Sequence, residues 1–214
     1  MTLAPMLVPE LAHAFTTAFP ATQIRYVEGD QEQLIIGLRR SETEVVLTYD
    51  LHVPDDIHFT PLVDLPPHVL VAEGHPLAEH AAVAMADIVD EPMILLDLPL
   101  SREYFLALFM AEGLQPKIAA RSAHQEVVRT MVANGHGYTL FNVRPRSDLA
   151  LDGKRLRRVR LAGTHRPMRI GLARLKQLNR SRLVEAFETH CRAFISDAYI
   201  PGMVAPVIER RVPR

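Results

Sequence analysis

Residues 93–113 read MILLDLPLSREYFLALFMAEG, and this stretch carries the pattern that decides the fold. Four apolar residues, 93–96, predict a short buried strand that stops at Asp97. Residues 102–112 predict a helix with its large apolar side chains on one face, and Gly113 is typical of a helix C-terminus. A buried strand followed at once by a helix is the repeating unit of α/β proteins.

The same rhythm continues on both sides of this stretch. Downstream, a strand (118–120), a helix (126–133) closed by Asn134-Gly135, and a further strand (138–141) follow. The remaining predicted strands are 24–28, 45–47, 69–72, 156–161 and 168–173; the remaining helices are 7–19, one capped by Asp30 and Gln33, and 181–195. The alternation predicts a mostly parallel sheet with helices on its faces, and two such runs predict two lobes.

Composition limits the classes of function. The 214 residues carry a formal net charge of −1, so the chain lacks the basic excess that a protein needs to hold DNA by itself. The single cysteine, Cys191, excludes an intrachain disulfide and predicts a buried thiol. The first ten residues do not resemble a signal peptide, and no apolar run is long enough to span a membrane. We therefore expect a cytoplasmic protein with no membrane contact.

Motifs for catalysis and for cofactors are absent from the sequence. There is no nucleophile elbow, no Walker-type loop and no G-x-G-x-x-G, and the ten histidines show no metal-ligand spacing. Gly135-His136-Gly137 is better explained as a helix end that opens into a strand. The sequence thus predicts no catalytic residues, no cofactor and no metal.

Eight short segments, taken in order, resemble the effector-binding domain of LysR-type transcriptional regulators along roughly residues 1–197. They are Thr2-Leu3-Ala4-Pro5, Pro9-Glu10-Leu11, Phe19-Pro20, Glu28-Gly29-Asp30-Gln31, Leu47-Thr48-Tyr49-Asp50, Gly74-His75-Pro76-Leu77-Ala78, Glu91-Pro92-Met93-Ile94-Leu95-Leu96-Asp97 and Val132-Ala133-Asn134-Gly135-His136-Gly137. The resemblance implies an α/β fold of two Rossmann-like lobes of the periplasmic-binding-protein type II kind, joined by two crossover strands. Lobe I would comprise residues 1–67 plus 166–197, lobe II residues 68–165, and 198–214 would form a flexible tail.

The resemblance also implies a function. Members of this family sense a small-molecule effector in the cleft between the lobes and relay binding to the arrangement of a homodimer or tetramer. They contact DNA through an N-terminal helix-turn-helix, which has no counterpart in this chain. The family's first strand is missing as well, because Thr2 already corresponds to the turn after it. We expect either a truncated regulator domain or a stand-alone sensor, with something else in that strand's place or a weakened fold.

Candidate ligand-binding residues follow from a general rule and from the resemblance together. Ligands of open α/β sheets bind beyond the carboxyl ends of the strands, beside helix N-termini. The residues that this selects are Thr2, Leu3, Asp30, Thr48, Tyr49, Leu98, Pro99, Leu100, Ser101, Arg102, His124, Gln125 and Asn142.

Each of these residues has a functional and a plainly structural interpretation. Thr2 suits a carboxylate but also a helix cap, and Asp30 would select an amine or hydroxyl or simply cap a helix. Ser101 and Arg102 are good partners for an anion, although Arg102 also fits an exposed first turn. Tyr49 either lines the pocket or packs between lobes. The apolar residues 98–100 suit a small carboxylate or aromatic acid as the effector.

Two other functions compete with effector sensing. An enzyme acting on a small organic acid in the same cleft would need a general base, for which Asp30, Asp97 and His124 are the candidates. A secreted solute-binding protein is disfavoured because no signal peptide is recognised. The sequence favours effector sensing without catalysis.

Overall fold

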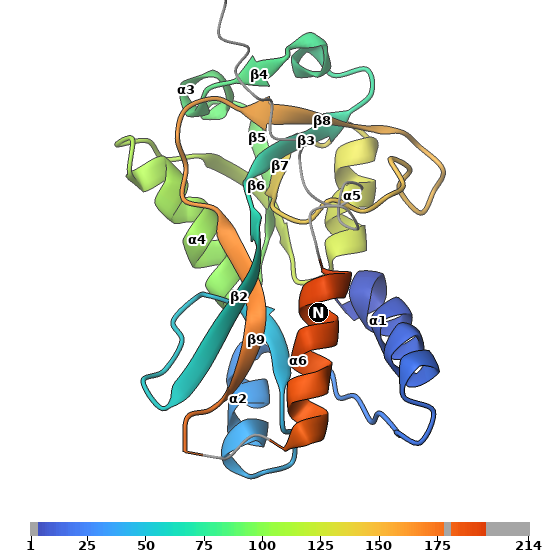
Figure 1. The fold of residues 1–214 in the computed structure, drawn as a ribbon. Helices are drawn as coiled ribbons and strands as arrows, with labels where there is room; N and C mark the ends of the chain where they lie inside the picture. The colour runs from blue at the N-terminus through green and yellow to red at the C-terminus, as the bar shows by residue number, and fades with distance from the viewer. Residues whose placement is uncertain (1–3, 178–180, 196–214) are drawn as a thin grey trace, which may run out of the picture. The chain divides into compact units, whose positions relative to one another are not determined.

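The structure is a computed structural model, and it describes residues 4–177 and 181–195 (Figure 1). Its internal contacts divide the chain into two units. Of the described residues, unit 1 comprises 4–65, 167–177 and 181–195, and unit 2 comprises 66–166. The predicted tail, 198–214, lies outside the described residues.

The sheet of unit 1 has three strands in the order β1-β9-β2, which are β1 (Val46–Tyr49), β9 (Met168–Leu175) and β2 (Ile57–Leu65). Both pairings with β9 are antiparallel. The register of β2 shifts between Pro61 and Val63. Proline has no N–H to donate, so a break in the ladder is where a strand tolerates it.

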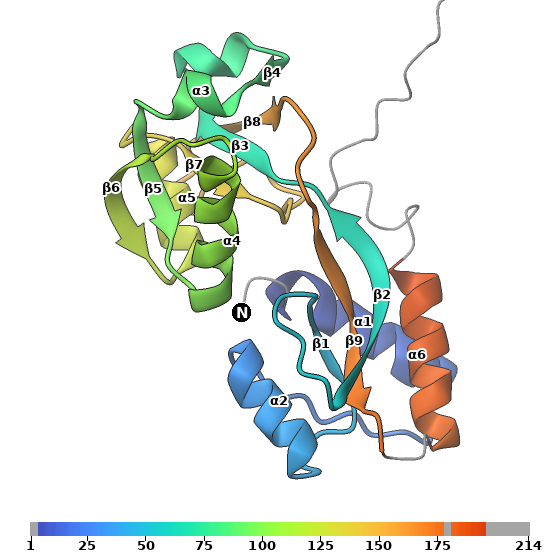
Figure 2. The same cartoon turned by 90° about the vertical axis from the view of Figure 1, so that its left-hand side faces the viewer.

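Helices cover both faces of this sheet (Figures 1 and 2). On one face, α1 (Ala4–Ala18) and α6 (Arg182–Phe194) bury Leu11 and Cys191 against Leu172 of β9. On the other face, α2 (Gln31–Arg39) buries Ile35 and Leu38 against β1, β2 and β9 through Val46, Ile57 and Ala173. The alternation of Leu172 and Ala173 along β9 places these two clusters on opposite sides.

Unit 2 contains a mixed sheet in the order β4-β8-β3-β7 and a parallel pair, β5-β6. These strands are β3 (His68–Ala72), β4 (Ala82–Val83), β5 (Pro92–Leu96), β6 (Lys117–Ser122), β7 (Thr139–Phe141) and β8 (Leu156–Leu161); the helices are η1 (Pro76–Glu79), α3 (Met85–Ile88), α4 (Pro99–Met110) and α5 (Gln125–Ala133). A parallel bridge between Met93 and Tyr138 links β5 to the start of β7.

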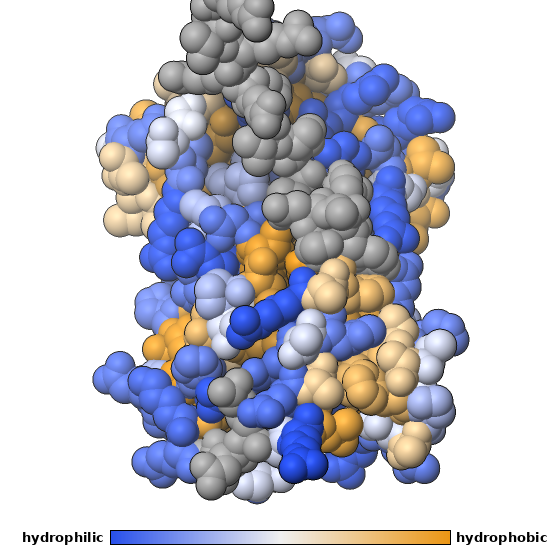
Figure 3. Space-filling view, viewed as in Figure 1, coloured by the Kyte–Doolittle hydropathy of each residue, from blue (hydrophilic) through white to orange (hydrophobic). Residues whose placement is uncertain are grey.

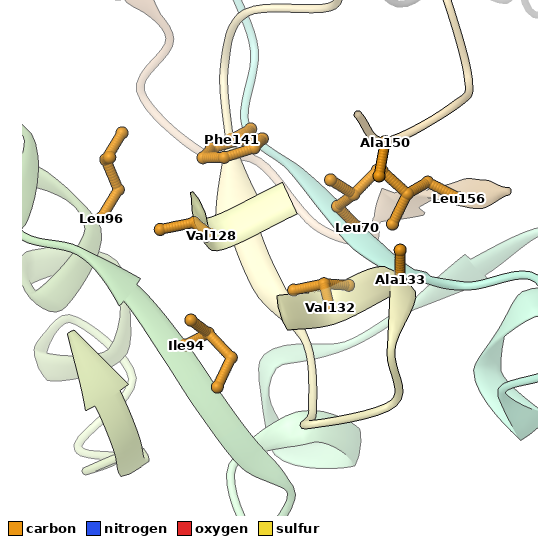
Figure 4. Packing of buried hydrophobic residues seen from close by; sticks show 9 residues of the cluster. All are labelled: Leu70, Ile94, Leu96, Val128, Val132, Ala133, Phe141, Ala150 and Leu156. Atoms are coloured by element: carbon orange, nitrogen blue, oxygen red, sulfur yellow. The ribbon is translucent and has the colours of Figure 1, made fainter. Parts of the chain in front are cut away.

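The core of unit 2 lies between α5 and the strands (Figure 4). Its buried side chains come from four strands (β3, β5, β7 and β8), from one loop residue and from the helix, and they are Leu70, Ile94, Leu96, Val128, Val132, Ala133, Phe141, Ala150 and Leu156. This cluster fixes α5, and therefore the residues at its N-terminus, relative to β5.

Two arginines hold the loop that follows β7. Arg129 of α5 is 2% exposed and donates to the carbonyl oxygens of Ser147 (3.1 Å) and Leu149 (2.8 Å). Arg158 of β8 donates to the carbonyl oxygen of Pro145 (3.1 Å) and pairs with Asp148. The guanidinium groups of one helix residue and one strand residue thus hold the loop in place.

Most elements expected from the sequence are confirmed. The predicted strand at 93–96 is β5, the helix at 102–112 is α4, and Gly113 ends it with a φ of 70°. The predicted capping box is present, since the Asp30 carboxylate accepts from the N–H of Gln33 and the Gln33 side chain accepts from that of Asp30.

Two expectations were wrong. Residues 24–28 do not form a strand, because no described strand lies beside them to complete a ladder. The sheets are not mostly parallel, since both pairings in unit 1 and two of the three pairings in the larger sheet of unit 2 are antiparallel. The strand β2 was missed, because Pro61 and an irregular burial pattern hide the alternation typical of a strand.

Candidate functional site

The candidate site in unit 2 lies where β5 and β6 end. These strands are parallel, so their carboxyl ends meet at one edge of the sheet. Asp97 follows β5, and its backbone N–H donates to the carbonyl oxygen of Ser122, the last residue of β6, over 2.8 Å. Two helices start from this edge, α4 after Asp97 and α5 after Ser122.

Asp97 is the electrostatic centre of this edge. Its carboxylate accepts from Nη1 of Arg102 at 2.7 Å, and Nη1 of Arg121 lies 3.9 Å from its other oxygen. The side chains of Asp97 and Arg102 are 25% and 36% exposed. Two guanidinium groups therefore face one carboxylate, and this small cluster carries a net positive charge.

The first turn of α4 adds backbone donors beside these charges. Leu98 is the N-cap residue and forms no side-chain cap, and Pro99 occupies the first turn. The first N–H groups of a helix have no partner within the helix and favour a nearby anion. Leu98 packs against the core cluster, and Ser101 and Arg102 in the first turn of α4 are half-buried.

His124 stands at the start of α5. It is the N-cap residue, it is exposed, and its imidazole makes no capping hydrogen bond, although its backbone N–H donates to Oγ of Ser122 over 3.1 Å. Gln125 is half-buried in the first turn of the helix. The α5 N-terminus is thus capped only weakly, and its free N–H groups face the same edge as Asp97.

Asn142, which follows β7, is buried at 4% exposure. Its side-chain amide donates to the hydroxyl of Tyr104 over 3.3 Å, and that hydroxyl donates to the carbonyl oxygen of Arg166 over 2.5 Å. Asn142 therefore helps to hold α4 in unit 2. Whether it also contacts a ligand stays a prediction.

In unit 1, the predicted residues gather around the start of α2. The hydroxyl of Thr48, at the end of β1, donates to Oε1 of Gln31 over 3.0 Å, and Nε2 of Gln31 donates to the carbonyl oxygen of Leu51. Asp30 precedes Gln31 and caps the helix. Tyr49 is half-buried, and Thr2 and Leu3 lie outside the described residues.

The capping contact of Asp30 gives a first expected result. Asp30→Ala should lower the stability of unit 1 by about 1 kcal/mol, because an orphan N–H of α2 loses its acceptor. Asp30→Asn should retain most of that stability, since the amide oxygen still accepts. Urea unfolding of the two variants measures the difference, and equal losses would show that the charge of Asp30 has a role beyond capping.

Sequence reasoning missed three residues of these sites. Gln31 was overlooked beside the stronger capping signal of Asp30, and Arg121 was left just outside the strand predicted at 118–120. Tyr104 was assigned only to a helix. The signal for Arg121 was its position one residue before the end of a parallel strand, at the edge to which ligands bind.

The described residues offer no group of three or more histidine, cysteine or carboxylate side chains arranged to hold a metal ion. Among them, no helix combines the length and the apolar character needed to cross a bilayer.

Comparison with known proteins identifies what the chain is similar to. The model of the LysR substrate binding domain matches residues 1–196. The crystal structure of HinK, a LysR family regulator from Pseudomonas aeruginosa, superposes with a TM-score of 0.88 at 36% identity, covering 92% of this chain and 68% of HinK. OxyR of Escherichia coli is 27% identical over 141 residues, which is 65% of this chain and 46% of OxyR. The chain thus spans about half the length of such curated relatives.

Two more distant structures share the fold and contain small acids. The effector-binding domain of QuiR with shikimate superposes with a TM-score of 0.75 at 23% identity over 90% of this chain. The effector-binding domain of BenM with benzoate superposes with a TM-score of 0.76 at 19% identity over 92% of it.

Proposed function

Because the chain belongs to the family of LysR substrate-binding domains, we propose that it senses a small-molecule effector without catalysing a reaction. Its fold is the two-lobed periplasmic-binding-protein type II fold of its structural neighbours. The observation that carries the proposal is the pair of guanidinium groups, Arg102 and Arg121, that share the carboxylate of Asp97 beside two helix N-termini.

The chemistry of this edge favours an anionic ligand. A ligand carboxylate would take over one guanidinium from Asp97 and accept from the free N–H groups at the start of α4 or α5. Ser101 lies in the same turn as Arg102 and offers a hydroxyl. We therefore propose a small carboxylate or aromatic acid, the class to which the benzoate of BenM belongs.

Unit 1 would supply the second half of the site. Asp30, Gln31 and Thr48 present a carboxylate, an amide and a hydroxyl at one end of β1. In this proposal a ligand contacts both units and favours the arrangement of units to which it binds more tightly, by no more than that difference in affinity. Tyr49, His124, Gln125 and Asn142 remain candidates for further contacts.

The relay to an oligomer is a further part of the proposal. Apolar residues gather on the surface over α1, where Phe19 just beyond its end is 39% exposed (Figure 3). Such a surface suits a contact between copies of the chain, as a homodimer or a tetramer. Binding to DNA, in this view, belongs to a helix-turn-helix outside these residues, and the protein acts in the cytoplasm.

The cysteine of this chain does not favour peroxide sensing, although several relatives are named hydrogen peroxide-inducible genes activators. Cys191 is buried, and burial followed by the nearby Glu188 raises the pKa of its thiol to about 12. Oxidation requires an accessible thiolate, so this thiol is a poor target for peroxide. We propose a sensor of binding rather than of oxidation.

The enzymatic alternative has less support. Of the three candidate bases, Asp30 is engaged in a capping box and Asp97 in an ion pair with Arg102. His124 is exposed, and none of the described contacts orients its imidazole as a base.

A thermal-shift series tests the proposed site. Among benzoate, shikimate and the amino acids, a compound that raises the melting temperature of the parent chain should bind Arg102→Ala at least about tenfold more weakly, because a charge-assisted hydrogen bond is lost. The matched control is Arg157→Ala, which removes an exposed arginine paired with Glu73 elsewhere in unit 2. An equal loss of the shift in both variants would contradict the assignment.

A further inference from the structure

Asp97 lies between two arginines of unit 2 and holds them unequally. Arg102, in the first turn of α4, donates from Nη1 to one carboxylate oxygen over 2.7 Å, the length of a strong charge-assisted hydrogen bond. On β6, Nη1 of Arg121 lies 3.9 Å from the other carboxylate oxygen, which is too long for a hydrogen bond. Asp97 thus pairs fully with Arg102 and only loosely with Arg121.

A change of partner would require only the side chain of Asp97 to move. Its backbone N–H donates to the carbonyl oxygen of Ser122 over 2.8 Å, which fixes the main chain between the ends of β5 and β6. A shift of about 1 Å would bring the carboxylate within hydrogen-bond distance of Arg121. The side chains of Asp97, Arg102 and Arg121 are 25%, 36% and 48% exposed, so an exchange of partners leaves no charge buried and unpaired.

The first turn of α4 is the better of the two helix starts for a ligand carboxylate. Pro99 has no N–H, but the N–H groups of Leu100 and Ser101 have no acceptor within the helix. This turn contains no acidic residue, whereas the first turn of α5 contains Glu126, whose negative charge opposes an anion there. A carboxylate at α4 would therefore bind beside Arg102, in the same turn.

We propose that Asp97 is an internal competitor for the effector: it occupies Arg102 in the empty site and moves to Arg121 when a ligand carboxylate takes its place. This inference rests on the proposed function and gives Arg121 a positioning role without contact to the ligand. If Arg121 were absent, the displaced Asp97 would face the ligand's negative charge with no cation beside it. Only an ionised acid can exchange with Asp97 in this way, so the site discriminates against neutral analogues such as amides and esters.

A double-mutant cycle tests the exchange, with the affinities for benzoate and shikimate measured by calorimetry. Asp97→Asn should bind the acid at least about tenfold more tightly, because Arg102 loses its competing carboxylate. Arg121→Gln should bind it about tenfold more weakly, because the displaced Asp97 loses its second partner. In the double variant no carboxylate has to be received, so adding Arg121→Gln to Asp97→Asn should change the affinity by about twofold or less.

The cycle separates this inference from simpler explanations. Equal weakening by Arg121→Gln in both backgrounds would show that Arg121 attracts the ligand directly, and unchanged or weaker binding by Asp97→Asn would show that Asp97 does not compete; either result overturns the proposal. The matched control, Arg157→Gln, removes an arginine paired with Glu73 and should leave the affinity unchanged. An equal loss in this control would reduce the effect of Arg121 to net charge and overturn it too.

Failure of the inference and failure of the proposed function give different results. If the parent chain binds an acid but the two substitutions are not coupled, this inference alone is overturned. If neither acid binds any of the four proteins of the cycle, the proposed effector site is contradicted and the inference falls with it.

Discussion

Gly137→Ala is expected to destabilise unit 2 by about 3 kcal/mol or more, one of the largest losses for a single methyl group in this chain. A Cβ at this position would lie 2.0 Å from the carbonyl oxygen of Pro92, and the backbone φ is 140°, which disfavours any side chain. The contact cannot relax easily, because the same carbonyl accepts the N–H of Tyr138 over 2.9 Å. This approach aligns β5 with β7 and thereby positions Asp97.

The matched control is Gly135→Ala, two residues earlier. Gly135 also has a positive φ, 80°, but a Cβ there would meet nothing within 4 Å. Gly135→Ala should therefore lower the free energy of unfolding by only about 1 kcal/mol, the cost of placing a side chain on a backbone with positive φ. Thermal or urea unfolding compares the two variants. Similar losses for both would mean that the close approach to Pro92 contributes nothing.

Acidification is expected to destabilise unit 2 through His68. Burial, followed by the nearby Arg158 and Arg144, lowers the pKa of His68 from 6.5 to about 3. The native state therefore excludes a proton that the unfolded chain binds below pH 6.5. Stability is fully present above pH 6.5 and is lost as the pH falls toward 3, by about 1.4 kcal/mol for each pH unit.

Comparison with His68→Gln isolates this contribution. Glutamine does not titrate, so the free energy of unfolding of the variant should fall less steeply than that of the parent chain. Between pH 6.5 and pH 4 the two curves should diverge by about 3 kcal/mol. Parallel curves over this range would show that the pKa of His68 is the same in the folded and the unfolded chain.

Local signals in the sequence were sufficient wherever one segment determines its own conformation. The capping box of Asp30 and Gln33 and the helix stop at Gly113 need no distant partner, and both are as predicted. The strand at 24–28 shows the limit of such reasoning. Its residues have the composition of a strand, but a strand also needs a neighbour, which composition does not reveal.

The candidate site was predicted in part, for a similar reason. Position at a strand end selected Arg102 and Thr48, but the sequence does not show that Arg102 pairs with Asp97 or that Thr48 bonds to Gln31. Arg121 was missed because its contact with Asp97 depends on the pairing of β5 with β6. Charges brought together by tertiary structure cannot be found from spacing along the chain.

The central claim is that a small acid binds at strand ends in both units, and backbone amide NMR during titration with benzoate or shikimate tests it most directly. The account predicts that a binding acid moves the amide resonances of residues 98–102 and 122–125 in unit 2 together with those of residues 30–31 and 48–49 in unit 1. Saturable shifts confined to other parts of the chain, with these four segments unmoved, would contradict it.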